Sequence, residues 1–328
     1  MYKIGRRTFL TGAAALAGGA YVQTQRSAFA QEAWPSKPVR FVVGLAPGGG
    51  LDFIARLTAD VATKAIGQQI VIENRTGAGG VISIEAVMQS PPDGYTFLVI
   101  NDNLASAPHV QQLPNDFTKS LMPVCLLGLQ PQVFAVHPSL NIETMDGLMK
   151  FIKANPDQSC ATSGVGSNQH VLLAWFLQAT GLKMTHVPYR GAGQAIGDLV
   201  GGQIKIACLG PTAIMPHYKA GKLRVLAQSG AKRNPALPNI PTLVELGIKD
   251  VIIESWYAAF APLNTPQSIV AKLNAGLNKA TADANVRERL FGTATEAAGG
   301  TPADLEKLYL TDAAKYARLV KELGITAK

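Results

Sequence analysis

The chain has 328 residues, 47% of them hydrophobic and 16% charged, which is enough length and apolar content for two modest domains with buried cores. Four basic residues and no acidic residue lie within residues 1–30, so the formal charge of +8 for the whole chain becomes +4 for the remainder. This mild charge, without any run of lysine or arginine, excludes a nucleic-acid footprint and is compatible with a small anionic ligand.

Residues 1–30 have the pattern of a cleaved export signal of the twin-arginine (Tat) type. Arg6-Arg7-Thr8-Phe9-Leu10 precedes an apolar stretch rich in alanine and glycine, and Ala28-Phe29-Ala30 is a small-x-small cleavage site. The mature chain is therefore expected to start at Gln31, in the periplasm. Gly5 stands where Ser or Thr is usual, which leaves the Sec route open. An uncleaved anchor is the other alternative, but glycines interrupt a stretch too short to span a bilayer.

Predicted strands and helices alternate through most of the chain, which indicates an α/β fold with largely parallel sheets. In the C-terminal part, Thr265-Pro266 and Thr301-Pro302 each place a capping hydroxyl before a proline, and Asp304 follows at capping-box spacing. The expected helices include residues 52–66, 144–154 and 169–180. The expected strands are residues 40–45, 70–73, 95–100, 132–136, 159–162, 184–188, 204–209, 223–228 and 252–261.

Cysteine and histidine give no sign of a metal centre or of a disulfide framework. Cys125, Cys160 and Cys208 each lie in an apolar segment, so buried free thiols are favoured over a single disulfide. The five histidines lack metal-ligand spacing. The sequence therefore predicts no metal and no cofactor.

Two glycine-rich loops each follow a predicted strand and open a predicted helix. The first is Ala46-Pro47-Gly48-Gly49-Gly50-Leu51-Asp52, and the second is Asn74-Arg75-Thr76-Gly77-Ala78-Gly79-Gly80. Glycine lets backbone N–H groups approach a ligand closely, and a helix N-terminus adds unpaired donors and partial positive charge. Two such loops in one α/β unit predict a site for a small carboxylate or phosphate.

Several longer motifs lie outside these loops. Near the N-terminus they are Trp34-Pro35-Ser36-Lys37-Pro38 and Pro92-Asp93-Gly94-Tyr95-Thr96. Later ones are Ser163-Gly164-Val165-Gly166-Ser167-x-x-His170, His186-Val187-Pro188-Tyr189-Arg190-Gly191 and Ala236-Leu237-Pro238-x-Ile240-Pro241-Thr242. Together with the two glycine-rich loops, these motifs resemble the Bug-type proteins, the substrate-binding receptors of tripartite tricarboxylate transporters, over essentially the whole mature chain.

The resemblance implies a two-lobed periplasmic-binding-protein fold with a ligand cleft between the lobes and two crossover strands. Domain 1 would comprise residues 31–131 and 255–328, and domain 2 would comprise residues 132–254. It also implies a monomeric periplasmic receptor that binds a small organic carboxylate. By hinge closure, the receptor would deliver this ligand to the membrane permease of a tripartite tricarboxylate-type transporter.

Within this frame, the backbone of residues 48–50 is expected to bind a ligand carboxylate, and residues 78–80 to form a second wall. Ser167 would donate its hydroxyl or cap its helix, and His170 would contact ligand or be structural. Asp52 is expected to cap its helix, and Arg190 to clamp a carboxylate or face solvent. The residues expected to bind ligand are Pro47, Gly48, Gly49, Gly50, Leu51, Ala78, Gly79, Gly80, Ser163, Gly166, Ser167, His170, Tyr189 and Leu209.

Three departures from the family pattern bear on the ligand: Leu51 replaces a common Thr, Cys160 a common Tyr, and Leu209-Gly210-Pro211 an acidic or amide-bearing segment. Without an acid near position 209, a buried ligand ammonium would lack a partner. The sequence therefore favours a carboxylate with an apolar or aromatic body over an amino acid.

Two other function classes stay open at this point. The same fold would serve a ligand sensor that presents its closed form to a signalling partner. An enzyme is the remote alternative, since Gly191-Ala192-Gly193 follows a strand as a dinucleotide loop would, but the expected acidic residue is absent. Ser163 with His170 suggests a hydrolase, yet neither Ser163 nor Ser167 lies in a nucleophile elbow.

Overall fold

The computed structural model describes residues 34–111, 113 and 117–326. The predicted export signal, residues 1–30, and its cleavage point before Gln31 lie outside the described residues. The chain divides after Ser36, and residues from Lys37 onward form one compact unit, to which the following description refers.

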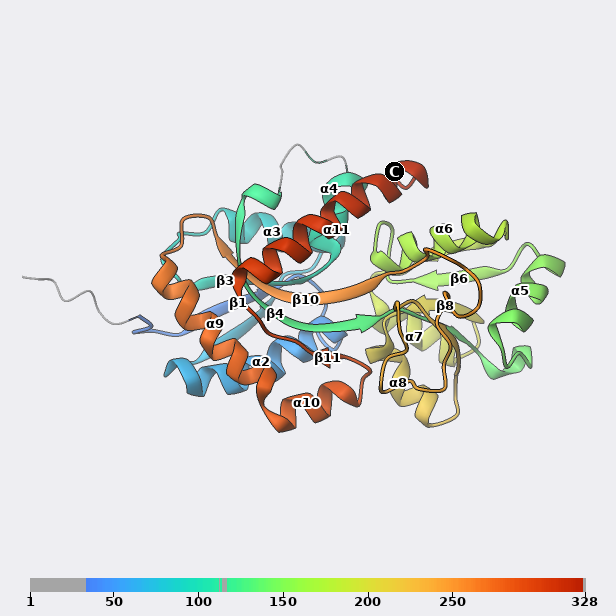
Figure 1. Cartoon of the computed structure of the whole chain (residues 1–328), viewed down its shortest axis with the longest axis horizontal. Helices are drawn as coiled ribbons and strands as arrows, with labels where there is room; N and C mark the ends of the chain where they lie inside the picture. The colour runs from blue at the N-terminus through green and yellow to red at the C-terminus, as the bar shows by residue number, and fades with distance from the viewer. Residues whose placement is uncertain (1–33, 112, 114–116, 327–328) are drawn as a thin grey trace, which may run out of the picture. The chain divides into compact units, whose positions relative to one another are not determined.

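The first of two sheets has six strands in the order β11-β4-β10-β3-β1-β2 (Figure 1). Strands β1, β2 and β3 are parallel to one another, as expected for strands joined by helical crossovers. Strands β10, β4 and β11 extend this sheet in antiparallel pairing. The bounds are β1 Val39–Val43, β2 Ile70–Asn74, β3 Thr96–Asn101, β4 Leu121–Pro131, β10 Glu254–Pro262 and β11 Glu296–Ala297.

The second sheet has five strands in the order β7-β6-β8-β5-β9. Strand β6 is parallel to both β7 and β8, whereas β5 is antiparallel to both β8 and β9. The strands are short and four of them are almost wholly buried, which is typical of a sheet covered on both faces. The bounds are β5 Val133–Val136, β6 Ser159–Thr162, β7 Thr185–Pro188, β8 Ile206–Leu209 and β9 Arg224–Gln228.

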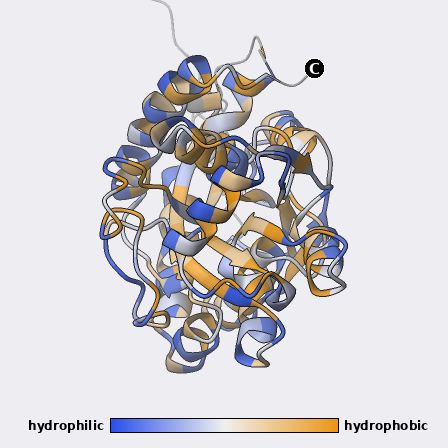
Figure 2. Cartoon of the chain, turned by 90° about the vertical axis from the view of Figure 1, so that its right-hand side faces the viewer, coloured by the Kyte–Doolittle hydropathy of each residue, from blue (hydrophilic) through white to orange (hydrophobic). Residues whose placement is uncertain are grey.

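The helices enclose the two sheets, and in Figure 2 the hydrophobic residues concentrate on the strands that the helices surround. Around the first sheet lie α2 Gly50–Ile66, α3 Val81–Met88, α4 Asn103–Val110, α9 Gln267–Ala282, α10 Ala284–Phe291 and α11 Pro302–Glu322. Around the second sheet lie α5 Met145–Ala154, α6 Asn168–Thr180, α7 Ala192–Val200 and α8 Pro211–Lys219. The 3₁₀ turns are η1 Ala78–Gly80, η2 Phe117–Lys119 and η3 Pro138–Leu140.

The chain passes between the sheets twice. Strand β4 ends at Pro131 and β5 begins at Val133, so Gln132 alone separates them; the return lies between β9 and β10. The two passages are bonded to each other, because the Gln132 N–H donates to Ser229 Oγ over 2.8 Å and the Ser229 N–H donates to the Gln132 carbonyl over 2.9 Å. The mixed α/β fold with two lobes agrees with the expectation, while the predicted domain boundaries stay a prediction.

The local expectations divide into confirmed and wrong ones. Thr301 is the N-cap of α11 and forms a reciprocal capping box with Asp304, as predicted. The predicted cap at Thr265 is wrong: Pro266 is at the N-cap of α9, and the Thr265 hydroxyl donates backward to the Pro262 carbonyl. Two strands were not predicted, β4 and the two-residue β11.

The cysteine expectation is confirmed, since Cys125, Cys160 and Cys208 are buried free thiols. Burial raises the pKa of Cys125 and of Cys160 to about 12, so both stay protonated and unreactive near neutral pH. Within residues 34–326, as far as they are described, no helix has the length and apolarity needed to cross a bilayer.

We predict that Thr301→Ala lowers the free energy of unfolding by about 1 kcal/mol, because it removes a side-chain acceptor from an orphan N–H at the start of α11. Urea denaturation with an unchanged m-value would measure this. Thr311→Ala in the same helix is the matched control and should change stability by less than about 0.5 kcal/mol. Equal effects of the two substitutions would contradict the capping account.

Candidate functional site

In the first glycine-rich loop, only some of the backbone N–H groups are free to bind a ligand. Helix α2 begins at Gly50 with Gly49 at its N-cap and no side-chain cap. Asp52 lies at the third helical position and accepts the Gly48 N–H over 3.0 Å, so the expected donation from Gly48 to a ligand is not available in this arrangement. The backbone N–H groups of Gly49 and Gly50 have no hydrogen bond among the described residues.

Asp52 was expected to cap its helix, but α2 has no side-chain cap: the Asp52 carboxylate accepts the N–H of Gly48, which precedes the N-cap residue Gly49. Burial opposes its ionisation, but hydrogen bonds from Arg56, Gly48 and Asn74 outweigh that effect and lower the pKa of Asp52. The charged carboxylate therefore holds the loop in shape and is not free to bind a ligand cation.

The second loop forms η1 and is held by α4. Gln111 Nε2 donates to the Ala78 carbonyl over 2.6 Å, and Asn103 Nδ2 donates to the Gly79 carbonyl over 3.2 Å. Ala78 and Gly79 are exposed, whereas Gly80 is buried, with φ of +105°. A Cβ at Gly80 would lie 2.7 Å from Ile100 Cδ1, so this position requires glycine. Ala78 and Gly79 remain accessible to a ligand.

In the second lobe, the loop that opens α6 uses most of its polar groups on itself. Ser167 is the N-cap of α6: its Oγ accepts the His170 N–H and donates to the Gly164 carbonyl. Ser163 Oγ donates to Gln169 Oε1. The capping alternative for Ser167 therefore describes the contacts in this structure, and ligand binding by Ser163 and Ser167 stays a prediction.

His170 and His186 form a stacked pair whose ring centroids are 3.8 Å apart. His170 Nδ1 accepts the Gly166 N–H, which assigns the proton to Nε2, and His186 Nε2 is 2.6 Å from the Thr162 hydroxyl. Burial lowers the pKa of each ring to about 4, and for His170 the neighbouring His186 adds to this effect. The pair is neutral at physiological pH and shapes the loop.

Four further expected residues take positions that the sequence left open. The Tyr189 hydroxyl donates to Asp198 over 2.8 Å, and Arg190 is exposed. Leu209 lies with its side chain in the apolar core of the second lobe, and Leu51 is equally buried in α2. The side chains of Leu51 and Leu209 therefore pack in the core rather than line an open surface, and only the backbone of these two residues could reach a ligand.

Thr212 of α8 and Tyr257 of β10 bring the first loop against the second lobe. Tyr257 Oη accepts from Gln130 Nε2 over 2.6 Å, and the Thr212 hydroxyl donates to Gln130 Oε1 over 3.0 Å. A Cβ at Gly50 would lie 2.5 Å from Tyr257 Oη and 3.1 Å from Thr212 Oγ1. The start of α2 thus faces the start of α8 across a crossover strand.

A second contact between the lobes involves α4. The Ser106 hydroxyl donates to the Gly166 carbonyl over 3.1 Å, and a Cβ at Gly166 would overlap the side chain of Val110. Because α4 also holds the loop at residues 78–80, one short helix connects the glycine-rich loops of both lobes.

Beside these contacts lies Asp102, a fully buried carboxylate. It accepts hydrogen bonds of 2.6 Å from Asn168 Nδ2, from the Ser255 hydroxyl and from the Tyr316 hydroxyl. Burial raises its pKa to about 6, and the hydrogen bonds offset this effect only in part. The donors come from α6, β10 and α11, so Asp102 ties both lobes together.

The sequence did not predict Asp102 and the polar side chains around it at the end of β3. A local signal was present in the triplet Asn101-Asp102-Asn103, whose first residue ends the fully buried strand β3. Gln130 and Tyr257 carry no such local signal, because they meet only through the pairing of β4 with β10.

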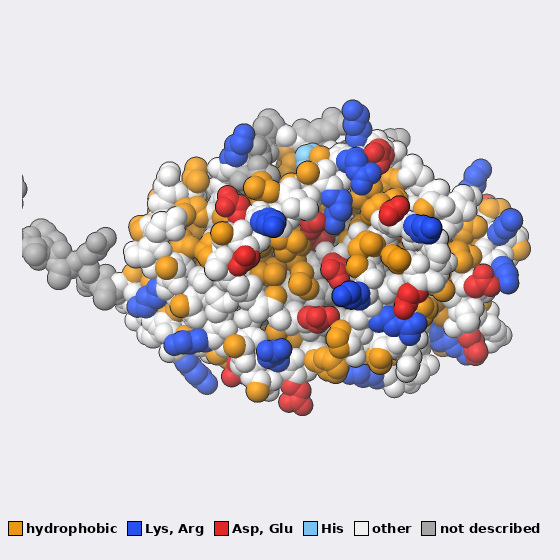
Figure 3. Space-filling model, in the orientation of Figure 1, with side chains coloured by type: hydrophobic (Ala, Val, Ile, Leu, Met, Phe, Trp, Pro, Cys, Tyr) orange, Lys and Arg blue, Asp and Glu red, His pale blue; other side chains and the backbone are white. Residues whose placement is uncertain are grey.

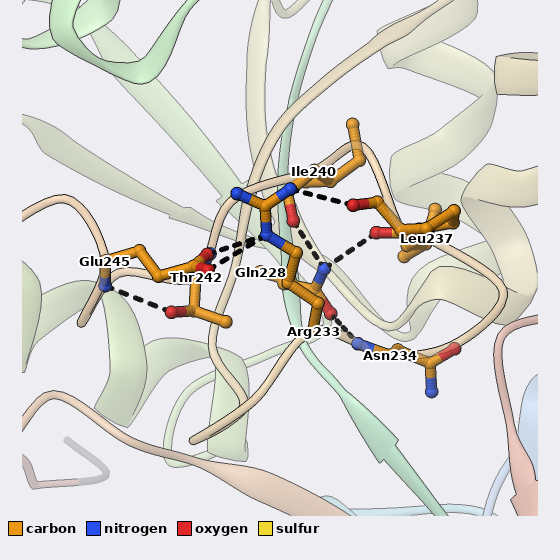
Figure 4. Close-up of polar contacts among 8 residues, drawn as sticks. Gln228, Arg233, Asn234, Leu237, Ile240, Thr242 and Glu245 are labelled. Atoms are coloured by element: carbon orange, nitrogen blue, oxygen red, sulfur yellow. Dashed lines mark hydrogen bonds and ion pairs between the residues drawn. The ribbon is translucent and has the colours of Figure 1, made fainter.

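The return passage to the first lobe is braced by a network around Gln228 (Figure 4). Gln228 Nε2 donates to the carbonyls of Leu237 and Ile240, and its Oε1 accepts the Asn234 N–H. Asn234 Nδ2 in turn reaches Glu296 of β11, in the first sheet. These hydrogen bonds therefore hold the return passage in a defined conformation.

The distribution of charged side chains does not indicate a second binding site. On the face shown in Figure 3, basic and acidic side chains are interspersed rather than gathered by sign. Among the described residues, no group of three or more His, Cys, Asp or Glu side chains is arranged to hold a metal ion.

A family model described as "Tripartite tricarboxylate transporter family receptor" (TctC) matches residues 54–325. The chain belongs to this family. BugT of Bordetella pertussis is 31% identical over 301 residues, which cover 90% of this chain and 92% of BugT. The solved structure of the periplasmic binding protein BugD has a TM-score of 0.85 at 29% identity and covers 90% of this chain and 100% of BugD.

Two solved structures of this TctC receptor's relatives contain ligands. A Rhodopseudomonas palustris protein with adipate has a TM-score of 0.85 at 30% identity, covering 89% of this chain and 99% of that protein. MatC from Rhodopseudomonas palustris with bound malate has a TM-score of 0.82 at 29% identity, covering 88% and 100%. The chain is a Bug-type binding protein of the TctC family, with the periplasmic-binding-protein fold, and not an enzyme.

We predict that His170 and His186 stay neutral from pH 7 to pH 5, because burial lowers the pKa of both to about 4. The unfolded chain protonates its histidines near pH 6.5, so it binds more protons than the folded chain between about pH 6.5 and 4. Stability should therefore fall as pH decreases through that window. NMR titration of the two imidazole Cε1–H signals measures this, and midpoints near 6.5 would contradict it.

Proposed function

We propose that this chain is a periplasmic receptor that binds a small organic carboxylate between its lobes and delivers it to the membrane permease of a tripartite tricarboxylate-type transporter. The observation that carries the proposal is the pair of glycine-rich loops, with free N–H groups at Gly49 and Gly50 and an accessible wall at Ala78 and Gly79. Such donors at helix starts suit a carboxylate. Adipate and malate in the related structures are both carboxylates.

The proposal also covers the location of the receptor, its membrane partner and its oligomeric state. The predicted export signal and the likeness to BugD, a periplasmic binding protein, support the periplasm as its location. The family description supports a permease as partner. The receptor is expected to act as a monomer, since the ligand groups proposed here all come from one chain.

Hinge closure is the proposed mechanism. Ligand bonds from both lobes can form together only when the lobes approach, so a ligand shifts the population toward the closed form. Contacts such as Ser106 with Gly166 and Thr212 with Gln130 would then be made in the closed form and lost on opening. The permease would recognise the closed surface.

The proposed ligand body is apolar or aromatic rather than that of an amino acid. Two acids close to the loops are already engaged, Asp52 with Arg56 and Asp102 with three donors. A buried ligand ammonium without a free carboxylate partner would be strongly disfavoured.

A thermal-shift screen of the purified protein tests the proposal. Its panel would span dicarboxylates, tricarboxylates, aromatic acids, keto acids and acidic amino acids. We expect one class of carboxylate to raise the melting temperature, because a ligand that binds the folded state stabilises it by mass action. Mass spectrometry of the denatured protein would identify a ligand retained from expression. No shift, together with no carboxylate released on denaturation, would refute the receptor proposal.

Gly50→Ala should weaken ligand binding by about tenfold or more, because its Cβ would lie 3.1 Å from Thr212 Oγ1 of the second lobe and resist closure while leaving the backbone N–H in place. Small-angle scattering at saturating ligand should give a larger radius of gyration for the variant than for the natural chain. Gly197→Ala, with open space around its Cβ, is the matched control. A variant that binds and contracts like the natural chain would contradict the closure account.

A further inference from the structure

Four buried side-chain amides lie where the two lobes meet, and we call this group the polar edge. Each of them has one atom without a hydrogen-bond partner among the described residues. They are Asn101 Oδ1, Asn103 Oδ1, Gln132 Nε2 and Asn168 Oδ1. All four side chains belong to residues less than 10% exposed. A buried amide atom without a partner is unfavourable, and native proteins almost always pair it with protein, water or ligand.

For two of these amides, the neighbouring groups fix which atom is the oxygen. Asn103 Nδ2 donates to the Gly79 carbonyl, and Asn168 Nδ2 donates to the Asp102 carboxylate. Turning either amide around would set an oxygen against an oxygen. The Asn103 and Asn168 oxygens are therefore true acceptors, and what they lack is a donor.

In Asn101, the buried Oδ1 makes no hydrogen bond with any described residue. Asn101 ends β3 in register with Tyr257, whose hydroxyl lies beside Gly50. Asn103, two residues on, holds the Gly79 carbonyl of the second loop. Asn103 is thus bonded to the second loop, and Asn101 is paired with the residue whose hydroxyl adjoins the first loop.

We propose that the ligand carries a hydroxyl group in addition to its carboxylate, and that Asn103 and Asn101 accept or exchange hydrogen bonds with that hydroxyl. The inference rests on the proposed receptor function and refines its ligand: a hydroxylated acid on an otherwise apolar frame. A carboxylate offers only acceptors, so it can satisfy Gly49 and Gly50 but not an amide oxygen. A hydroxyl supplies the missing donor without bringing a charge into the cleft.

An ammonium group would also donate to these oxygens, but it would need a counter-charge. Asp102, adjacent to both asparagines, already accepts three hydrogen bonds, and Asp52 is bonded to Arg56. A neutral donor fits this edge better than a cation. Of the two ligands in the related structures, malate carries a hydroxyl and adipate does not.

Calorimetric titration with matched acid pairs tests the inference. The pairs are succinate and malate, glutarate and 2-hydroxyglutarate, and benzoate and 4-hydroxybenzoate, with aspartate and glutamate as the ammonium members. In at least one pair, the hydroxylated acid should bind about tenfold more tightly than its parent, as one added hydrogen bond to a buried acceptor would give. It should also bind more tightly than the corresponding amino acid.

Asn101→Leu identifies the residue responsible. We expect the variant to lose most of the preference for the hydroxylated acid while melting at the same temperature or higher, because the substitution removes a buried amide oxygen that has no partner among the described residues. Asn155→Leu, at the exposed end of α5, should leave the preference unchanged. An unaltered preference in Asn101→Leu and in Asn103→Leu would overturn the assignment to these residues.

The outcomes separate the two proposals. If carboxylates bind but every parent acid or amino acid binds as tightly as its hydroxylated counterpart, the hydroxyl inference is overturned and the receptor function stands. If no carboxylate binds and none is released on denaturation, the receptor function is overturned and the refinement falls with it.

Discussion

The buried carboxylate of Asp102 is the interaction on which the arrangement of the lobes depends. Removing a carboxylate from water is costly unless donors replace the lost hydration. Ser255 of β10 and Tyr316 of α11 belong to the same lobe as Asp102, and Asn168 of α6 belongs to the other, so the carboxylate has all three protein donors only when the two lobes meet. If the lobes separate, water can solvate the same carboxylate. Asp102 therefore has two acceptable environments, as a reversible closure requires.

Helix α4 transmits this arrangement to the ligand loops. It begins directly after Asp102, holds the carbonyls of Ala78 and Gly79 through Gln111 and Asn103, and contacts Gly166 through Ser106. A shift of α6 relative to Asp102 is therefore coupled by direct contacts to the second glycine-rich loop. The coupling needs no long pathway, because each step is a hydrogen bond between neighbouring elements.

The sequence predicted the alternating α/β pattern, most strands of both sheets and the capping box at Thr301, because each depends on local periodicity or on a few adjacent residues. It missed β4, whose run of apolar residues with Pro123 shows no alternation, and β11, whose pairing is set by β4 rather than by its own two residues. It placed the glycine-rich loops but not their partners. Tyr257 meets Gln130 across 127 positions, a contact that local spacing cannot show. The bond between Asp52 and Gly48 is local, but the sequence predicted a helix cap there rather than a bond to the loop.

These contacts give the backbone and the side chains of the proposed site different roles in binding. The loops offer backbone donors held in place before any ligand arrives, Gly48 by Asp52 and Gly79 by Asn103, so little conformational entropy remains to be lost on binding. Such donors recognise a carboxylate in general and distinguish poorly between acids. The asparagines of the 101–103 turn, where acceptor oxygens lack donors, are the groups able to distinguish one acid from another. Affinity would then come from glycine backbone, and specificity from asparagine side chains.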